Sequence, residues 1–122
     1  MLQFEIATAC HKIFTFELEL GLAGIGPGVR DAASARDDAR CKLGQWLHRE
    51  EARYAHLPGW PALIAAHREF HACAGEMIEQ VNAGHGDAAR CILEGRYRDA
   101  SAAVLKAIER LNAEVDTEQA AG

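Results

Sequence analysis

The sequence predicts an all-α protein, an antiparallel four-helix bundle that forms a homodimer. Apolar residues recur at three- and four-residue steps over four stretches of the chain, which is the period of an amphipathic helix. Only 3 of the 122 residues are proline, and segments rich in glycine and proline separate the stretches. Short connections between neighbouring helices favour an up-and-down order.

The chain is expected to form one domain over residues 1–122, with its core in residues 2–115 and a frayed tail at 116–122. A net charge of -5 gives no support to nucleic-acid binding. No stretch approaches the roughly 20 apolar residues that span a membrane, and no signal peptide is visible. We therefore expect a cytoplasmic protein whose 4 cysteines are thiols or metal ligands and not disulfides.

The first helix is expected from about Leu2 to Leu22, with two adjacent apolar stripes. The first stripe consists of Phe4, Ala7, His11, Phe14 and Leu18. The second stripe consists of Ile6, Cys10, Ile13 and Leu20. Because one bundle core needs only one stripe, the second stripe predicts a dimer interface. A flexible connection rich in glycine and proline, from Gly21 to Gly28, is expected to end this helix.

The second helix is expected to begin near Asp31 or Ser34, either of which can cap it, and to run to about Glu51. This helix carries Cys41. Gly44 follows three residues later on nearly the same side, so another part of the chain can come close to the sulfur. The residues of this helix that should pack inward are Leu43, Trp46 and Leu47.

A turn from Tyr54 to Pro61 leads into a third helix that is expected to end near Gly84. A fourth helix should begin at residues 85–87, with Asp87 as its cap. Its apolar stripe continues to Val115. Gly95 is a candidate for a break that would divide it into a short and a long piece.

Two histidines on the third helix dominate the functional interpretation. His67 and His71 are four residues apart, so their Cβ atoms lie about 5–6 Å apart on one side of a helix, and that side is the apolar one. One explanation is a pair of core histidines that are hydrogen-bonded to carbonyl groups. The other is a metal site, because both imidazoles can reach one ion.

Two further residues on inward faces complete a candidate metal site of His11, Cys41, His67 and His71. Three imidazoles and one thiolate suit a closed, tetrahedral zinc site. A zinc-protease helix would need glutamate where Arg68 stands. We expect no catalytic residues and no cofactor other than zinc.

Several blocks of this sequence carry a resemblance to a known family. They are His11 with Phe14, Cys41 to Trp46, Leu57 to Trp60, His67 to His71 and, more weakly, Gly95 to Ser101. In these blocks the chain resembles the bacterial chemoreceptor zinc-binding (CZB) domain, over roughly residues 7–112. The resemblance implies a helical, dimer-forming module with zinc ligands at His11, Cys41, His67 and His71. It also implies that the module regulates chemoreceptors or diguanylate cyclases in response to zinc or oxidants.

The sequence therefore predicts a stand-alone, zinc-binding sensory or regulatory module that acts on a partner signalling protein and is not an enzyme. One alternative is a zinc metalloenzyme in which water replaces one of the four ligands. Another is a purely structural dimerisation bundle with core histidines.

Other candidate residues are assigned lesser roles. His48 shares the face of Cys41 and is a minor alternative ligand. Asp37 could lie beside the sulfur of Cys41 or only complement the helix dipole. The remaining cysteines are expected to be packing residues with a secondary redox role as the alternative; they are Cys10, Cys73 and Cys91.

Overall fold

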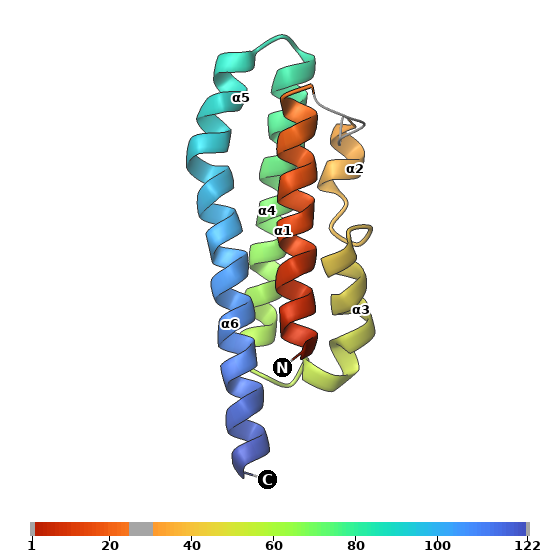
Figure 1. Ribbon diagram of the computed structural model, residues 1–122, viewed down its shortest axis with the longest axis vertical. Coiled ribbons are helices and arrows are strands. Elements are labelled where there is room, and N and C mark those ends of the chain that lie inside the picture. Colours follow the sequence, from red (N-terminus) through yellow and green to blue (C-terminus); the bar gives the residue numbers. More distant parts are fainter. Residues whose placement is uncertain (1, 25–30, 122) are drawn as a thin grey trace.

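The protein is described by a computed structural model that covers residues 2–24 and 31–121. Within these ranges it consists of helices with no strand, which confirms the all-α prediction. Its long helices lie side by side along one axis of the molecule (Figure 1). They are α1 (Leu2–Leu22), α3 (Lys42–Tyr54), α4 (Gly59–Asn82) and α6 (Arg98–Ala121). The glycine- and proline-rich residues 26–28, where we expected a flexible connection, lie outside the described ranges.

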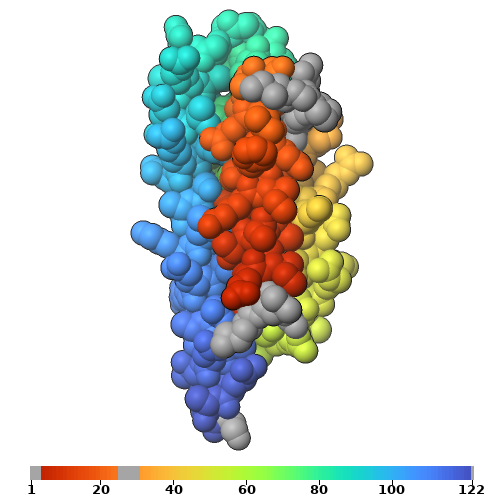
Figure 2. Space-filling view, viewed as in Figure 1, coloured from red at the N-terminus to blue at the C-terminus, as the bar shows by residue number. Residues whose placement is uncertain are grey.

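The two apolar stripes of α1 have different surroundings. The first stripe faces the core, where Phe4, Ala7, His11 and Leu18 are buried. The second faces outward, with Ile6 and Ile13 each 44% exposed in the single chain. Figure 2 shows α1, in red and orange, uncovered along the front of the molecule between α6 and α3.

The predicted second helix is divided in two, so the expectation of one continuous helix was wrong. Residues Ala32–Arg36 form the short helix α2, which Asp31 caps by accepting a hydrogen bond from the Ala33 backbone N–H at 3.2 Å. Asp37 then accepts a hydrogen bond from the backbone N–H of Ala39 at 3.0 Å. Such local bonds compete with helical ones, because they occupy the backbone groups that a helix needs. The helix resumes only as α3.

The connection between α4 and the next helix is set by Gly84. The Gly84 and His85 backbone N–H groups donate to the carbonyls of Val81 and Gln80, at 3.0 and 2.8 Å. This pair of bonds forms a Schellman motif, which needs a left-handed residue after the helix. Gly84 has φ of 82°, a value that glycine adopts without steric cost. The chain thereby reverses into α5 (Gly86–Ile92).

The predicted fourth helix is continuous but contains a π-helical turn. α5 passes into η1 (Leu93–Tyr97) and then into α6, so Gly95 marks a π-turn and not a break. Asp87 lies in the first turn of α5 and not at its cap. α6 remains helical to Ala121, past residue 116, where we expected the frayed tail to begin.

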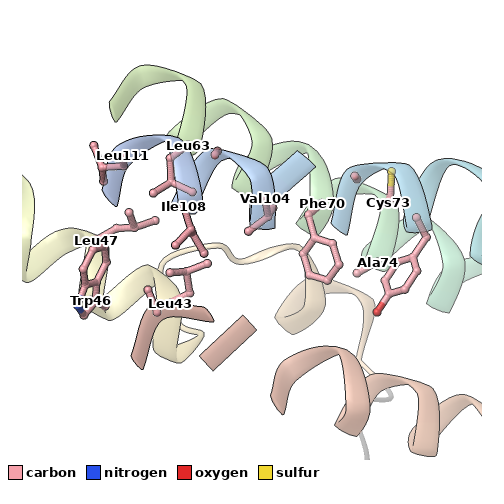
Figure 3. Close-up of a cluster of buried hydrophobic side chains, with 14 of the residues drawn as sticks. Leu43, Trp46, Leu47, Leu63, Phe70, Cys73, Ala74, Val104, Ile108 and Leu111 are labelled. Carbon is pink, nitrogen blue, oxygen red and sulfur yellow. The ribbon is translucent and has the colours of Figure 1, made fainter. Parts of the chain in front are cut away.

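The core lies between α4 and α6 and also includes the inner faces of α1 and α3. The buried side chains of Leu43, Trp46 and Leu47 lie among residues of α4 and α6 (Figure 3), which confirms their predicted inward positions. Burying a leucine or an aromatic side chain of this kind contributes about 1.5–3 kcal/mol. None of the helices within the described ranges is both long and apolar enough to cross a membrane.

Candidate metal centre

The histidine pair of α4 is buried in the middle of the fold. His67 is 2% exposed and His71 is 1% exposed, and both face inward as the apolar stripe predicted. Their rings stand edge to face with centroids 4.6 Å apart. The two Nε2 atoms are 3.0 Å apart, so both point at the same small volume.

A contact with α2 fixes the orientation of His71. Its Nδ1–H donates a hydrogen bond to the backbone carbonyl of Ala35 at 2.6 Å. A carbonyl only accepts, so the proton belongs on Nδ1 and the lone pair on Nε2. Histidine ligands of metal ions are usually held by such a second bond. The helix that supplies this carbonyl is itself tied to α4 by an ion pair between Arg36 and Glu79.

Cys41 occupies a different local position from the one expected. It is the N-cap of α3, not a residue inside a helix, and its Sγ accepts a hydrogen bond from the Gly44 N–H at 3.2 Å. A helix N-terminus favours negative charge, so this position suits a thiolate. The same sulfur lies 3.2 Å from His67 Nε2.

The glycine at position 44 permits a close backbone approach, as its spacing from Cys41 suggested. A Cβ atom at Gly44 would lie 1.8 Å from the carbonyl oxygen of Asp38, far inside contact distance. The segment between α2 and α3 therefore rests directly on the first turn of α3. Any larger side chain would displace the backbone that leads into Cys41.

Cys41, His67 and His71 together form a group whose ligand atoms all lie within 4.8 Å of one another. In a tetrahedral zinc site, bond lengths of about 2.0–2.1 Å to nitrogen and 2.3 Å to sulfur place ligand atoms roughly 3.3–3.6 Å apart. The observed separations of 3.0 Å between the two nitrogens and 3.2 Å from nitrogen to sulfur are slightly shorter. The three residues therefore fit a zinc ion after small outward movements.

Burial keeps the histidines of this region neutral. It lowers the pKa of His67 to about 3, and the nearby His71 and His11 add to the effect. Burial likewise lowers the pKa of His11 to about 4, and it also lowers the pKa of His71. Neutral imidazole is the form that binds metal. Burial raises the pKa of the Cys41 thiol, so metal binding has to release its proton.

His11 lies beside this group but is not part of it. Its ring is buried and stands edge to face against Phe70, with centroids 4.6 Å apart. Its Nε2 atom shares a hydrogen bond with Ser101 Oγ on α6 at 2.7 Å. The structure thus brings three of the four predicted ligands together and places the fourth next to them.

The lesser candidates are not among the three residues whose ligand atoms cluster. His48 is exposed and lines a pocket of about 300 Å³ together with His67. The Asp37 carboxylate bonds to the backbone of Ala39. The other cysteines differ in burial: Cys10 is half-buried, Cys73 is buried and Cys91 is exposed.

Sequence reasoning missed two partners of the histidines. The Ala35 carbonyl could not be found from a sequence, because any residue supplies one. Ser101 belongs to a motif that supported the family resemblance, but helix periodicity alone did not pair it with His11.

Comparison with known proteins identifies the family. The model of the chemoreceptor zinc-binding domain matches residues 11–78, which is more than half of the 122 residues and includes all four predicted ligands. No curated protein and no solved structure matches the chain. The matched family is one that binds zinc, and the Cys41, His67 and His71 group provides a place for the ion. The chain belongs to the chemoreceptor zinc-binding domain family.

Proposed function

We propose that this protein is a zinc-dependent sensory module in which His11, Cys41, His67 and His71 bind one zinc ion per chain. The observation that carries the proposal is the convergence of one sulfur and two imidazole nitrogens in a buried site of a zinc-binding family. The donors are neutral imidazoles and a thiol at a helix N-terminus, which is a ligand set that suits zinc.

The residues of the site have separate tasks in this proposal. His71 is held by the Ala35 carbonyl, so it offers its Nε2 lone pair in a fixed direction. Cys41 gives up its proton, and the Gly44 N–H stabilises the resulting sulfur charge. When bound, zinc adds a link between the start of α3, the middle of α4 and, through His11, α1. Binding energy of this kind contributes to folding stability.

The proposed role of the link is regulatory. Family membership supports an output through a signalling partner, such as a chemoreceptor or a diguanylate cyclase, in the cytoplasm. The input is either zinc occupancy or an oxidant. Cys41 is the sulfur ligand of the set, and conversion of its thiolate to sulfenic acid would weaken the site.

The proposed assembly is a homodimer of antiparallel four-helix subunits with α1 at the interface. Support comes from the outer face of α1, where Ile6, Ile13 and Phe16 are 44%, 44% and 63% exposed. Apolar side chains grouped on one helix face mark an interaction surface more often than isolated ones do.

The position of His11 favours one competing function. If His11 keeps its bond to Ser101, zinc has three protein ligands and a fourth position for water, as in catalytic zinc sites. The pocket that reaches His67 would then admit a small substrate. This alternative makes the protein a metalloenzyme and not a sensor.

Metal analysis tests the proposal. Untagged wild-type protein should contain about one zinc per chain, Cys41→Ala should contain much less, and the exposed-cysteine control Cys91→Ala should match wild type. X-ray absorption at the zinc edge should then show three nitrogen ligands and one sulfur ligand. Two nitrogens, one sulfur and one oxygen would support the metalloenzyme, and a zinc-free wild type would leave only the structural bundle.

The oxidant input has its own test. Zinc-loaded protein is treated with a mild peroxide, zinc release is followed with a coloured chelator, and mass spectrometry locates the modified cysteine. Modification of Cys41 in step with zinc release supports oxidant sensing. Modification of Cys10, Cys73 or Cys91 while zinc stays bound favours zinc sensing.

A further inference from the structure

Ser101 supplies a polar partner for a histidine that the proposed zinc site also needs. Its hydroxyl oxygen lies 2.7 Å from His11 Nε2, and the contact joins α6 to α1. The buried residues Ile92 and Tyr97 are five positions apart, which is a π-helical step, whereas α-helical neighbours on one face are three or four positions apart. The π-turn η1 therefore determines which side of α6 faces the core. Ser101 follows Tyr97 by four residues, and so lies on the same inward side.

His11 contacts both this hydroxyl and a residue next to one of the clustered ligands. Its ring packs against Phe70, which directly precedes His71 in α4. Phe14, one turn after His11 in α1, packs against the ring of His71 with centroids 4.8 Å apart. The α1 stripe therefore touches the metal group, although His11 itself is not among the residues whose ligand atoms cluster within 4.8 Å.

We propose that His11 has two alternative partners, the Ser101 hydroxyl in the metal-free protein and zinc in the loaded protein. Ser101 is then a positioning residue that holds His11 on α6 until the metal competes for it. This inference rests on the proposed function, because it needs zinc at Cys41, His67 and His71. The expected structural change is specific. On zinc binding, α1 would lose its hydrogen bond to α6 and become linked to α4 through the shared ion. With zinc bound, α1 and α6 would no longer be joined by the hydrogen bond between His11 and Ser101.

The first test is a change in zinc affinity, measured by competition with a chromophoric chelator. Ser101→Ala removes the competing partner of His11 and should raise zinc affinity about threefold to tenfold, the net worth of one hydrogen bond. Ser101→Thr retains a hydroxyl and should stay near wild type. Thr117→Ala, which removes an exposed hydroxyl from the same helix, should also leave the affinity unchanged. In a His11→Ala background, Ser101→Ala should have no effect, because the two residues act together.

The second test observes His11 directly by nitrogen-15 NMR of its ring. In metal-free protein, Ser101→Ala should shift the His11 ring signals. In zinc-loaded protein, wild type and Ser101→Ala should give the same His11 signals. These spectra also show whether the variant is folded.

The results that would overturn the inference differ from those that would overturn the zinc site. A 10- to 100-fold loss of affinity in Ser101→Ala, the range for a residue that supports a bound ligand, would mean that Ser101 and zinc hold His11 together. Unchanged affinity would mean that the hydroxyl does not compete. Either result leaves the zinc site intact, whereas a wild-type protein without zinc removes both proposals.

Discussion

α4 carries two buried histidines and α1 carries one to the same region of the molecule, but the two helices hold them in different ways. α4 packs against α2 and α6, and contacts from neighbouring helices fix its two histidines next to Cys41. α1 has one buried face and one exposed apolar face, and its histidine bonds to α6. Under the proposed function, the α4 histidines and Cys41 would form a site that is already assembled, while α1 would provide a ligand that changes partners.

The largest expected effect is on zinc binding, and it should differ between a histidine variant of α4 and a histidine variant of α1. His71→Ala should abolish stoichiometric zinc binding, because it removes one of the three clustered ligands. His11→Ala should retain zinc with an affinity lower by on the order of 10- to 100-fold. At zinc concentrations about 1,000 times the dissociation constant, bound zinc stabilises wild type by about 4 kcal/mol. For a domain of this size that corresponds to roughly 15 °C in melting temperature.

Calorimetry with and without zinc measures both variants. An equal loss of affinity in His71→Ala and His11→Ala would remove the distinction between α4 and α1. An unchanged melting temperature after verified metal removal would argue against any contribution of zinc to the fold.

The second prediction concerns pH in the metal-free protein. Folded His67 and His11 have pKa values of about 3 and 4, below the ordinary value of 6.5. Below pH 6.5 the unfolded chain therefore binds more protons than the folded one. The stability that the neutral histidines contribute is complete above about pH 6.5 and is lost as pH falls toward 4 for His11 and toward 3 for His67. A tenfold difference in proton affinity between the folded and unfolded chain is worth about 1.4 kcal/mol, so the loss should reach several kcal/mol.

Urea unfolding at pH 7, 6 and 5 measures this loss above the range in which most carboxyl groups titrate. The variant His67→Phe should have a weaker pH dependence, since it removes the group with the lowest pKa. A metal-free wild type with constant stability from pH 7 to 5 would show that the histidines are not buried in solution.

Residue-level detail shows what the sequence could and could not provide. The spacing of His67 and His71, and their place on an apolar stripe, were sufficient to predict a buried pair on one helix. The division between α2 and α3 was not predictable from periodicity, because it depends on a local bond of the Asp37 side chain that competes with helix formation. The hydrogen bond between His11 and Ser101 joins residues 90 positions apart, and only the packing of α1 on α6 creates it.

The third prediction concerns the segment that delivers Cys41. Gly44→Ala places a methyl group against the Asp38 carbonyl, so the segment has to move. We expect a loss of about 1–3 kcal/mol in stability, the usual cost of overpacking, together with weaker zinc binding. Gly95→Ala is the matched control, because its added methyl group would meet no atom within 4 Å beyond the adjacent residues and the backbone of its own helix. If both variants behave like wild type, the close approach at Gly44 does not shape the site.

The last prediction tests the outer face of α1 with Ile13→Asp. Among the variants discussed, this one should have the smallest effect on the stability of the subunit. Ile13 is 44% exposed, so a charge there should change the stability of the subunit by only about 0.5 kcal/mol. The same charge would be buried in a dimer that uses α1, and an unpaired charge in an apolar interface is strongly unfavourable. Light scattering at micromolar concentration should therefore give a dimer for wild type and a monomer for Ile13→Asp.

Val81→Asp is the control, because Val81 is 40% exposed but lies on α4, and it should remain dimeric. A monomeric wild type would exclude the proposed assembly, and dissociation by Val81→Asp alone would move the interface from α1 to the end of α4.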